Sequence, residues 1–155
     1  MSRTCCRFTP YLKLFIMTLQ YLSGFFDADG SISMSKSSKN DTYKCIKIDF
    51  TNTYITILEE IQKYLLDEYD IKTYLSKKPA RSKNHNISYC LSSNSNQNSL
   101  KLCKLLNSRH PKKLHRINTV LKYHDAVTIR NGKYTDKQAT RKLAYERLFF
   151  LPTFL

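Results

Sequence analysis

Two of the three glycines in this chain of 155 residues lie in one short stretch, LSGFFDADG, which spans residues 22–30. The apolar residues of the segment 18–26 recur at helical spacing, and we predict a helix that ends where the aspartates and Gly30 break the pattern. Gly24 and Ala28 share one face of this helix and present almost no side chain. Two copies of such a face can approach each other nearly backbone to backbone.

A close approach of two such helices brings Asp27 and Asp29 of each copy to the shared axis. The C-terminal end of a helix already carries a partial negative charge, so these carboxylates repel one another unless a cation neutralises them. Hard carboxylate oxygens suit Mg²⁺, which can also be shared with a phosphate group. The stretch therefore predicts a divalent-metal site between two copies of the chain.

The net charge of +14 comes entirely from the second half of the chain. Residues 1–76 hold nine Lys and Arg against nine Asp and Glu, whereas residues 77–155 hold seventeen against three. A basic surface of that size attracts polyanions and speeds their encounter with the protein. A merely soluble basic protein is the alternative interpretation of the charge alone.

Hydrophobic periodicity predicts the order helix, two strands, helix, two strands, helices. The strands are expected at 31–35, 43–52, 71–78 and 86–93, and the later helices from 56, over 100–107 and 112–129, and from 135. This order indicates an α+β fold, a single αββαββα domain with additional C-terminal helices. Thr56 and Glu59 suggest a capping box, and so do Thr135 and Gln138.

The first seventeen residues are interpreted as an N-terminal extension of a domain that spans residues 18–155. They contain three basic residues and no acid, which fits either an organellar targeting segment or an arm that contacts phosphates. The apolar run 14–26 is too short to span a bilayer. The five cysteines show no C-x-x-C spacing, so we expect neither a disulfide framework nor a zinc site, and a reducing compartment fits better.

The stretch LSGFFDADG resembles the motif of LAGLIDADG homing endonucleases. The matching positions are Leu22, Gly24, Asp27, Asp29 and Gly30. The resemblance implies a saddle-shaped antiparallel sheet and, since the chain holds one motif, a homodimer. It also implies a site-specific endonuclease that hydrolyses both strands of a long pseudo-palindromic DNA site with Mg²⁺ or Mn²⁺.

The resemblance further assigns residues to the expected catalytic site. Asp29 matches the metal-binding carboxylate of the family, which the backbone carbonyl of Ala28 assists. Lys113, with Lys112 as the alternative, matches a basic residue near the cleaved phosphate. Asn52 corresponds to a position that holds Gln or Asn in the solvent pocket of relatives. The dimer interface is expected to involve Leu22, Ser23, Gly24, Asp27 and Ala28.

In this family the sheet lies in the major groove, where alternate side chains of a strand face the base edges. The DNA-binding residues implied for this chain are Ser31, Ser33, Ser35, Cys45, Lys47 and Asp49, with Arg81 and Lys83 in the second hairpin and Lys112 and Arg116 further on. Serine and cysteine read bases weakly, so Lys47, Asp49 and Arg81 are expected to dominate. The register of the second hairpin stays open, because Ile71 and Tyr74 disagree about the inward parity.

Two alternatives share this fold but not the reaction. One is an RNA maturase that assists splicing of its host intron, and the other is a non-catalytic DNA-binding regulator. Asp29 favours cleavage, because splicing alone does not require a metal carboxylate at that position. The expected partners are double-stranded DNA, a second copy of the chain and, for a maturase, intron RNA, with no membrane. The family resemblance points to a mitochondrion or chloroplast, which the sequence itself does not decide.

Overall fold

The computed structural model describes residues 16–39, 41–80, 86–93, 95–129 and 133–151 of the chain. The helices and strands are α1 (Leu19–Asp29), β1 (Gly30–Ser35), β2 (Cys45–Asn52), α2 (Ile55–Tyr69), β3 (Thr73–Lys78), β4 (Ser88–Ser93), α3 (Asn96–Leu105), α4 (Pro111–Val127) and α5 (Asp136–Phe150). The expected αββαββα order with additional C-terminal helices is confirmed, and so is the α+β class.

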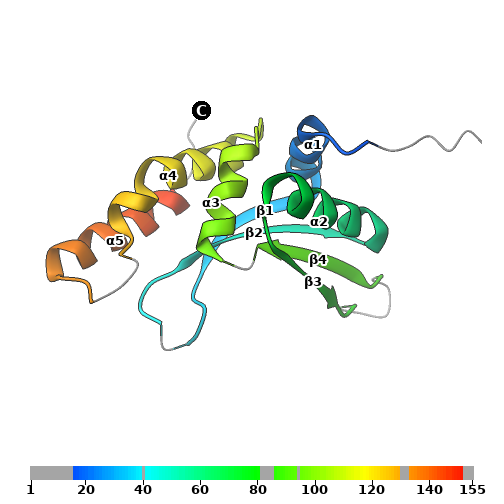
Figure 1. Cartoon of the computed structure of the whole chain (residues 1–155). Coiled ribbons are helices and arrows are strands. Elements are labelled where there is room, and N and C mark those ends of the chain that lie inside the picture. The colour runs from blue at the N-terminus through cyan, green and yellow to red at the C-terminus, as the bar shows by residue number, and fades with distance from the viewer. Residues whose placement is uncertain (1–15, 40, 81–85, 94, 130–132, 152–155) are drawn as a thin grey trace, which may run out of the picture.

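The strands form one open antiparallel sheet in the order β1-β2-β4-β3, so β2 and β4 are central (Figure 1). Helices α1 to α4 pack over one face of this sheet, and α5 lies against α4. The inward residues of β1 and β2 are the apolar ones of the alternating pattern, which confirms that prediction. They are Ile32, Met34, Ile46, Ile48 and Phe50.

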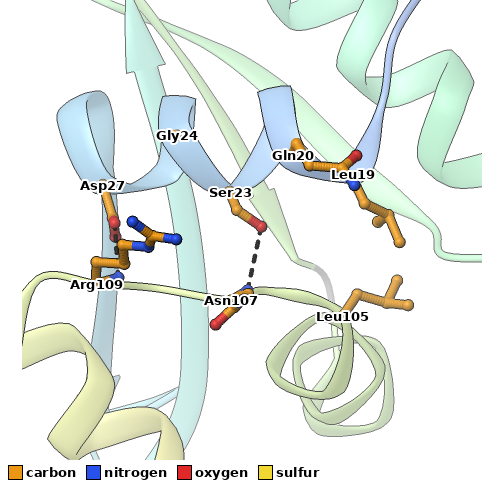
Figure 2. Close-up of a pocket in the computed structure, with 8 residues that line it drawn as sticks. All are labelled: Leu19, Gln20, Ser23, Gly24, Asp27, Leu105, Asn107 and Arg109. Atoms are coloured by element: carbon orange, nitrogen blue, oxygen red, sulfur yellow. Dashed lines mark hydrogen bonds between the residues drawn. The ribbon is translucent and has the colours of Figure 1, made fainter.

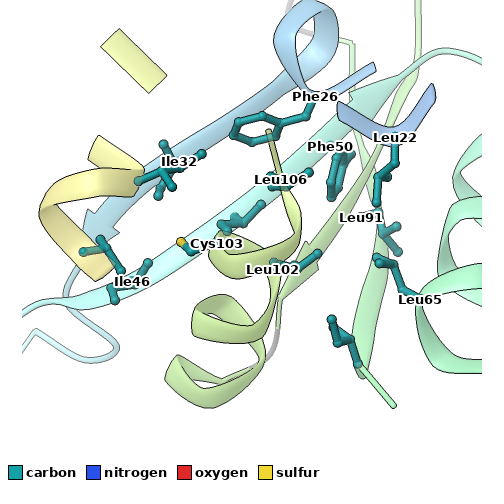
Figure 3. Packing of buried hydrophobic residues seen from close by; sticks show 14 of the residues in the cluster. Leu22, Phe26, Ile32, Ile46, Phe50, Leu65, Leu91, Leu102, Cys103 and Leu106 are labelled. Atoms are coloured by element: carbon teal, nitrogen blue, oxygen red, sulfur yellow. The ribbon is translucent and has the colours of Figure 1, made fainter. Parts of the chain in front are cut away.

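The core lies between this face of the sheet and the helices (Figure 3). The helices contribute Leu22, Phe26, Leu58, Ile61, Leu65, Leu102, Ile117 and Val120. Burial of a side chain of this size stabilises the fold by about 1.5–3 kcal/mol. Phe26 of α1 and Phe50 of β2 meet edge to face, with ring centroids 5.8 Å apart, which ties the motif helix to the central strand.

Helix α1 continues through Asp29, three residues beyond the expected end at Phe26, and passes directly into β1. Both aspartates of the motif therefore lie in the last turn of the helix. A Cβ atom at Gly30 would lie 2.6 Å from the carbonyl oxygen of Phe26 and in contact with its ring. This direct passage from helix to strand consequently requires glycine at position 30.

In β3 the odd-numbered residues, in line with Ile71, face the helices, and the even-numbered residues such as Tyr74 face away from them. Ile71 is completely buried, whereas 62% of Tyr74 is exposed. Leu75 pairs with Leu91, which in turn pairs with Phe50, so these three residues share the inner face. Tyr74 therefore points away from the helices.

Two of the expected helix starts are wrong. Helix α2 begins at Ile55, and no side chain caps it, so the capping box proposed from Thr56 does not form. The third helix begins at Asn96, several residues earlier than expected, because Ser95 accepts a hydrogen bond from the backbone of Asn98 as its N-cap. The capping box of Thr135 and Gln138 at the start of α5 is confirmed.

Helix α5 docks on α4 and contacts the segment that joins β1 to β2. Phe149 and Tyr145 are buried there, and Glu146 Oε1 accepts a hydrogen bond of 2.8 Å from the backbone of Lys44. Across the described residues, no helix combines the length and apolar character that a membrane crossing requires.

Candidate active site at the end of α1

The last residue of α1 and the last residue of β2 meet through their side chains. Asn52 Nδ2 donates a hydrogen bond of 2.9 Å to Asp29 Oδ2. The backbone N–H of Tyr54 donates to Asn52 Oδ1, also at 2.9 Å, which orients the amide so that its NH₂ group faces the carboxylate. Two of the three predicted catalytic residues are therefore in direct contact.

Lys113, the third predicted catalytic residue, reaches the same helix end from α4. Its Nζ donates to the carbonyl oxygens of Phe26 at 2.7 Å and Asp27 at 2.8 Å. The helix end leaves the Asp27 carbonyl without an intrahelical partner, whereas the Phe26 carbonyl also accepts from the backbone N–H of Gly30. Burial lowers the pKa of Lys113, and the charges of Asp27 and Asp29 oppose this shift without cancelling it. The carboxylate of Asp29, the amide of Asn52 and the ammonium group of Lys113 thus all lie at the C-terminal end of α1.

Asp27 forms hydrogen bonds with a different part of the chain, the segment that joins α3 to α4. Its Oδ1 accepts from Ser108 Oγ, and its Oδ2 accepts from the backbone N–H of Arg109 at 2.8 Å. Burial raises the pKa of Asp27, but these hydrogen bonds and the charge of Lys113 outweigh it, so the pKa lies below its ordinary value. Asp27 therefore fastens the motif helix to the segment that leads into α4, while Asp29 contacts β2.

The small-residue face of α1 is open. Gly24 and Ala28 are both exposed, and a Cβ atom at Gly24 would meet nothing within 4 Å among the described residues. A groove of about 430 Å³ lies beside this face, between α1 and the segment before α4 (Figure 2). It is lined by Leu19, Gln20, Ser23, Gly24, Asp27, Leu105, Asn107 and Arg109.

Three residues expected at a dimer interface have partners inside their own chain, and Asp27, described above, is one of them. Leu22 is completely buried in the core, so it is not available for contact with a second copy, and that expectation is corrected. Ser23 is 7% exposed, and its Oγ accepts a hydrogen bond of 3.1 Å from the backbone of Asn107 (Figure 2). The interface role of Leu22 was implied by the family resemblance, whereas its place in the apolar helical pattern of residues 18–26 already indicated the core.

The donor atoms at this helix end fit a hard divalent cation. Asp29 is exposed, and Asn52 occupies Oδ2 and leaves Oδ1 without a hydrogen bond in the described structure. The described part of the chain contains no cluster of three or more His, Cys, Asp or Glu residues that could hold a metal by itself. A cation at Asp29 would therefore need further ligands from water, phosphate or a second copy.

The outer face of the sheet, on the side away from the helices, is rich in small polar residues. It consists of Ser31, Ser33, Ser35, Cys45, Lys47, Asp49, Thr51, Tyr74, Ser76, Lys78, Ser88, Cys90 and Ser92. The six residues assigned to this face in β1 and β2 all lie on it. The sequence analysis missed the other seven. Thr51 continues the alternation of β2, whereas only the pairing register of the second hairpin places the six residues of β3 and β4. Arg81 and Lys83 lie outside the described residues.

The side chain of Arg116, which was expected to contact DNA, makes its contacts with other residues of the same chain. Its Nη1 donates to the carbonyl oxygen of Ile32 at 2.8 Å, and its guanidinium lies 5.0 Å from the centroid of the Phe149 ring. Burial lowers the pKa of Arg116. Lys112 on the same helix is exposed and remains available for a phosphate. Spacing along α4 could not separate these two roles, because the helix that covers Arg116 is a distant segment.

The model of the LAGLIDADG-like domain matches residues 17–107. A search of curated proteins finds no match. Among solved structures, the chain is similar to an archaeal intron-encoded homing endonuclease complexed with DNA, with 15% sequence identity and a TM-score of 0.49. That similarity covers 83% of this chain and 96% of the other chain.

Proposed function

The chain belongs to the LAGLIDADG family, and from this premise we propose that it is a site-specific, metal-dependent DNA endonuclease that acts as a homodimer. The observation that carries the proposal is the contact between Asp29 and Asn52 beside Lys113 at the end of the motif helix. A carboxylate held in one orientation next to an ammonium group suits phosphodiester hydrolysis.

In this proposal Asp29 and the backbone carbonyl of Ala28 hold Mg²⁺ or Mn²⁺. Bound there, the ion would stabilise negative charge on the phosphate and lower the pKa of an attacking water. Asn52 keeps Asp29 Oδ2 in place, so that Oδ1 remains directed to solvent for metal binding. The geometry supports this division between a ligand and a residue that orients it.

Lys113 would stabilise charge on the cleaved phosphate. An ammonium group has three donors, and two of those on Lys113 already bond to backbone carbonyls. One donor therefore remains for a phosphate oxygen. The carbonyl contacts hold the side chain at the end of α1, so the charge is positioned before DNA binds.

A second copy would complete the site. One chain contributes one metal carboxylate, and two-fold symmetry brings the same helix end from the partner to the axis. The exposure of Gly24 and Ala28 supports packing of two α1 helices along their small-residue faces. Because the interface is symmetric, the recognised site should be pseudo-palindromic.

The test is cleavage of a plasmid that carries the two sequences flanking the gene for this chain, joined without an intervening intron. With Mg²⁺ the protein should make one double-strand cut at the junction, and the Asp29→Asn variant should bind the same junction without cutting it. Failure of the parent to cut with either Mg²⁺ or Mn²⁺, while it binds that junction, would exclude the endonuclease. Binding and splicing of the host intron RNA would then favour the maturase.

A further inference from the structure

Asp49 is the one carboxylate on the outer face as far as the structure describes it. It lies on β2, a central strand of the sheet, and its neighbours across the strands are Ser31 and Ser92. Both neighbours are short, so neither extends past the Asp49 carboxylate. Any molecule that covers the middle of the outer face therefore meets this carboxylate.

The Asp49 carboxylate is fixed in place. Its Oδ1 accepts a hydrogen bond of 2.5 Å from Ser92 Oγ and lies 3.4 Å from Lys47 Nζ. Only 16% of its side chain is exposed, and Ser92 is buried. Its Oδ2 makes no hydrogen bond within the described ranges. The side chain thus presents one fixed acceptor on a face that is otherwise neutral or basic.

A fixed carboxylate on a face that binds a polyanion weakens binding unless it meets a donor. In the major groove the O6 and N7 atoms of guanine and the O4 atom of thymine are acceptors, and a carboxylate opposite them is repelled. Cytosine N4 and adenine N6 are both donors, but adenine also presents its N7 acceptor beside N6, so an aspartate is better suited to accept from cytosine. Lys47 lies beside Asp49 and offers a donor to the acceptors of the paired guanine.

We propose that Asp49 is a specificity-determining residue that requires cytosine at one position of each half-site, with Lys47 on the paired guanine. The inference rests on the proposed function, because a site-specific endonuclease must read base edges, and it takes the outer face as the surface that lies in the major groove. It goes further by naming the base. A good contact of this kind discriminates against other bases roughly ten- to hundredfold. The serines around Asp49 discriminate weakly, so this position should be among the most restricted of the site.

The experiment is selection of bound duplexes from a random DNA library, without divalent metal so that no duplex is cut. The parent should select a two-fold consensus with one strongly preferred C·G pair in each half. Asp49→Asn should lose that preference roughly ten- to hundredfold and should bind random DNA more tightly, because a negative charge has been removed. Ser92→Ala keeps the charge but releases the carboxylate, so it should weaken the preference without the gain in random binding.

Asp67→Asn is the matched control, because this exposed carboxylate lies on α2, on the other side of the sheet. It removes the same charge and should leave the consensus unchanged. Melting temperatures establish that all variants are folded. A parent consensus that Asp49→Asn reproduces at every position overturns the inference and leaves the endonuclease proposal standing. A parent that selects no common sequence overturns both.

Discussion

The side-chain amide of Asn52 donates a hydrogen bond to the carboxylate of Asp29 across the junction between the motif helix and the sheet. The backbone of Tyr54 fixes the orientation of that amide, so a residue of β2 controls the expected metal ligand on α1. In the proposed site, positioning and metal binding would therefore be carried by different side chains, and substitution should separate them.

Asp29→Asn should abolish cutting and leave DNA binding intact. The amide keeps the shape but removes the charge that attracts the cation, so the rate of cleavage should fall by several orders of magnitude. Loss of a negative charge at a helix C-terminus also favours folding slightly. Cleavage rate, DNA affinity and melting temperature, measured together, check this. If the variant cuts at close to the parental rate, Asp29 is not the metal ligand.

Asn52→Ala should weaken metal binding more than it weakens DNA binding. Without the amide, Asp29 loses the partner that holds its Oδ2, and loss of such a positioning residue typically lowers metal affinity about 10- to 100-fold. Cleavage should then require more Mg²⁺ and should recover at saturating concentration. A reduced rate that no Mg²⁺ concentration restores would instead indicate a direct role of Asn52 in the reaction.

Gly24→Val should leave a folded monomer that does not cut. A Cβ atom at this position meets nothing within 4 Å in the described part of one chain, so the fold accommodates the larger residue. Between two α1 helices, the branched side chain would prevent close packing. Sedimentation measures whether the variant dimerises, and circular dichroism measures whether it is folded. Gly24→Ala, with a smaller side chain, should disturb the dimer less. A Gly24→Val dimer of full activity would place the interface elsewhere.

Asp27→Asn should reduce stability, and the reduction should depend on pH. The pKa of Asp27 in the folded chain lies below the ordinary value of 3.8, so the carboxylate stabilises the fold above about pH 4. This contribution is lost as the pH falls from about 4 through the folded pKa. Denaturation curves at pH 7 and pH 3 should therefore show a larger difference between parent and variant at pH 7. If the difference in the free energy of unfolding between parent and variant is larger at pH 3 than at pH 7, the pKa of Asp27 is not lowered in the folded chain.

Lys112→Gln and Arg116→Gln should have different effects. Lys112 is exposed, so its loss should reduce the salt dependence of DNA binding by about one unit of slope and leave the melting temperature unchanged. Arg116 holds the carbonyl of Ile32 and packs on Phe149, so its loss should lower the melting temperature. If Arg116→Gln leaves the melting temperature unchanged and reduces the salt dependence of DNA binding, Arg116 contacts DNA and is not needed for the fold.

The sequence predicted what depends on local spacing and left open what depends on distant segments. Alternation in β1 and β2 identified their two faces correctly, because one face of each strand is buried. The hydrogen-bond partners of Asp27 and Arg116 lie more than eighty positions away in the chain, and no local pattern indicates them. Leu22 was assigned to an interface from the family resemblance, although the tertiary fold buries it.

Ser31, Ser33 and Ser35 alternate along β1 with residues that hold the core, and in the described structure their own side chains make no hydrogen bond. Substitutions at such surface positions usually change stability by less than about 0.5 kcal/mol. A descendant of this chain can therefore acquire longer side chains there one at a time and remain folded at every step. Under the proposed function, a change of target sequence through these positions would therefore cost the fold little stability.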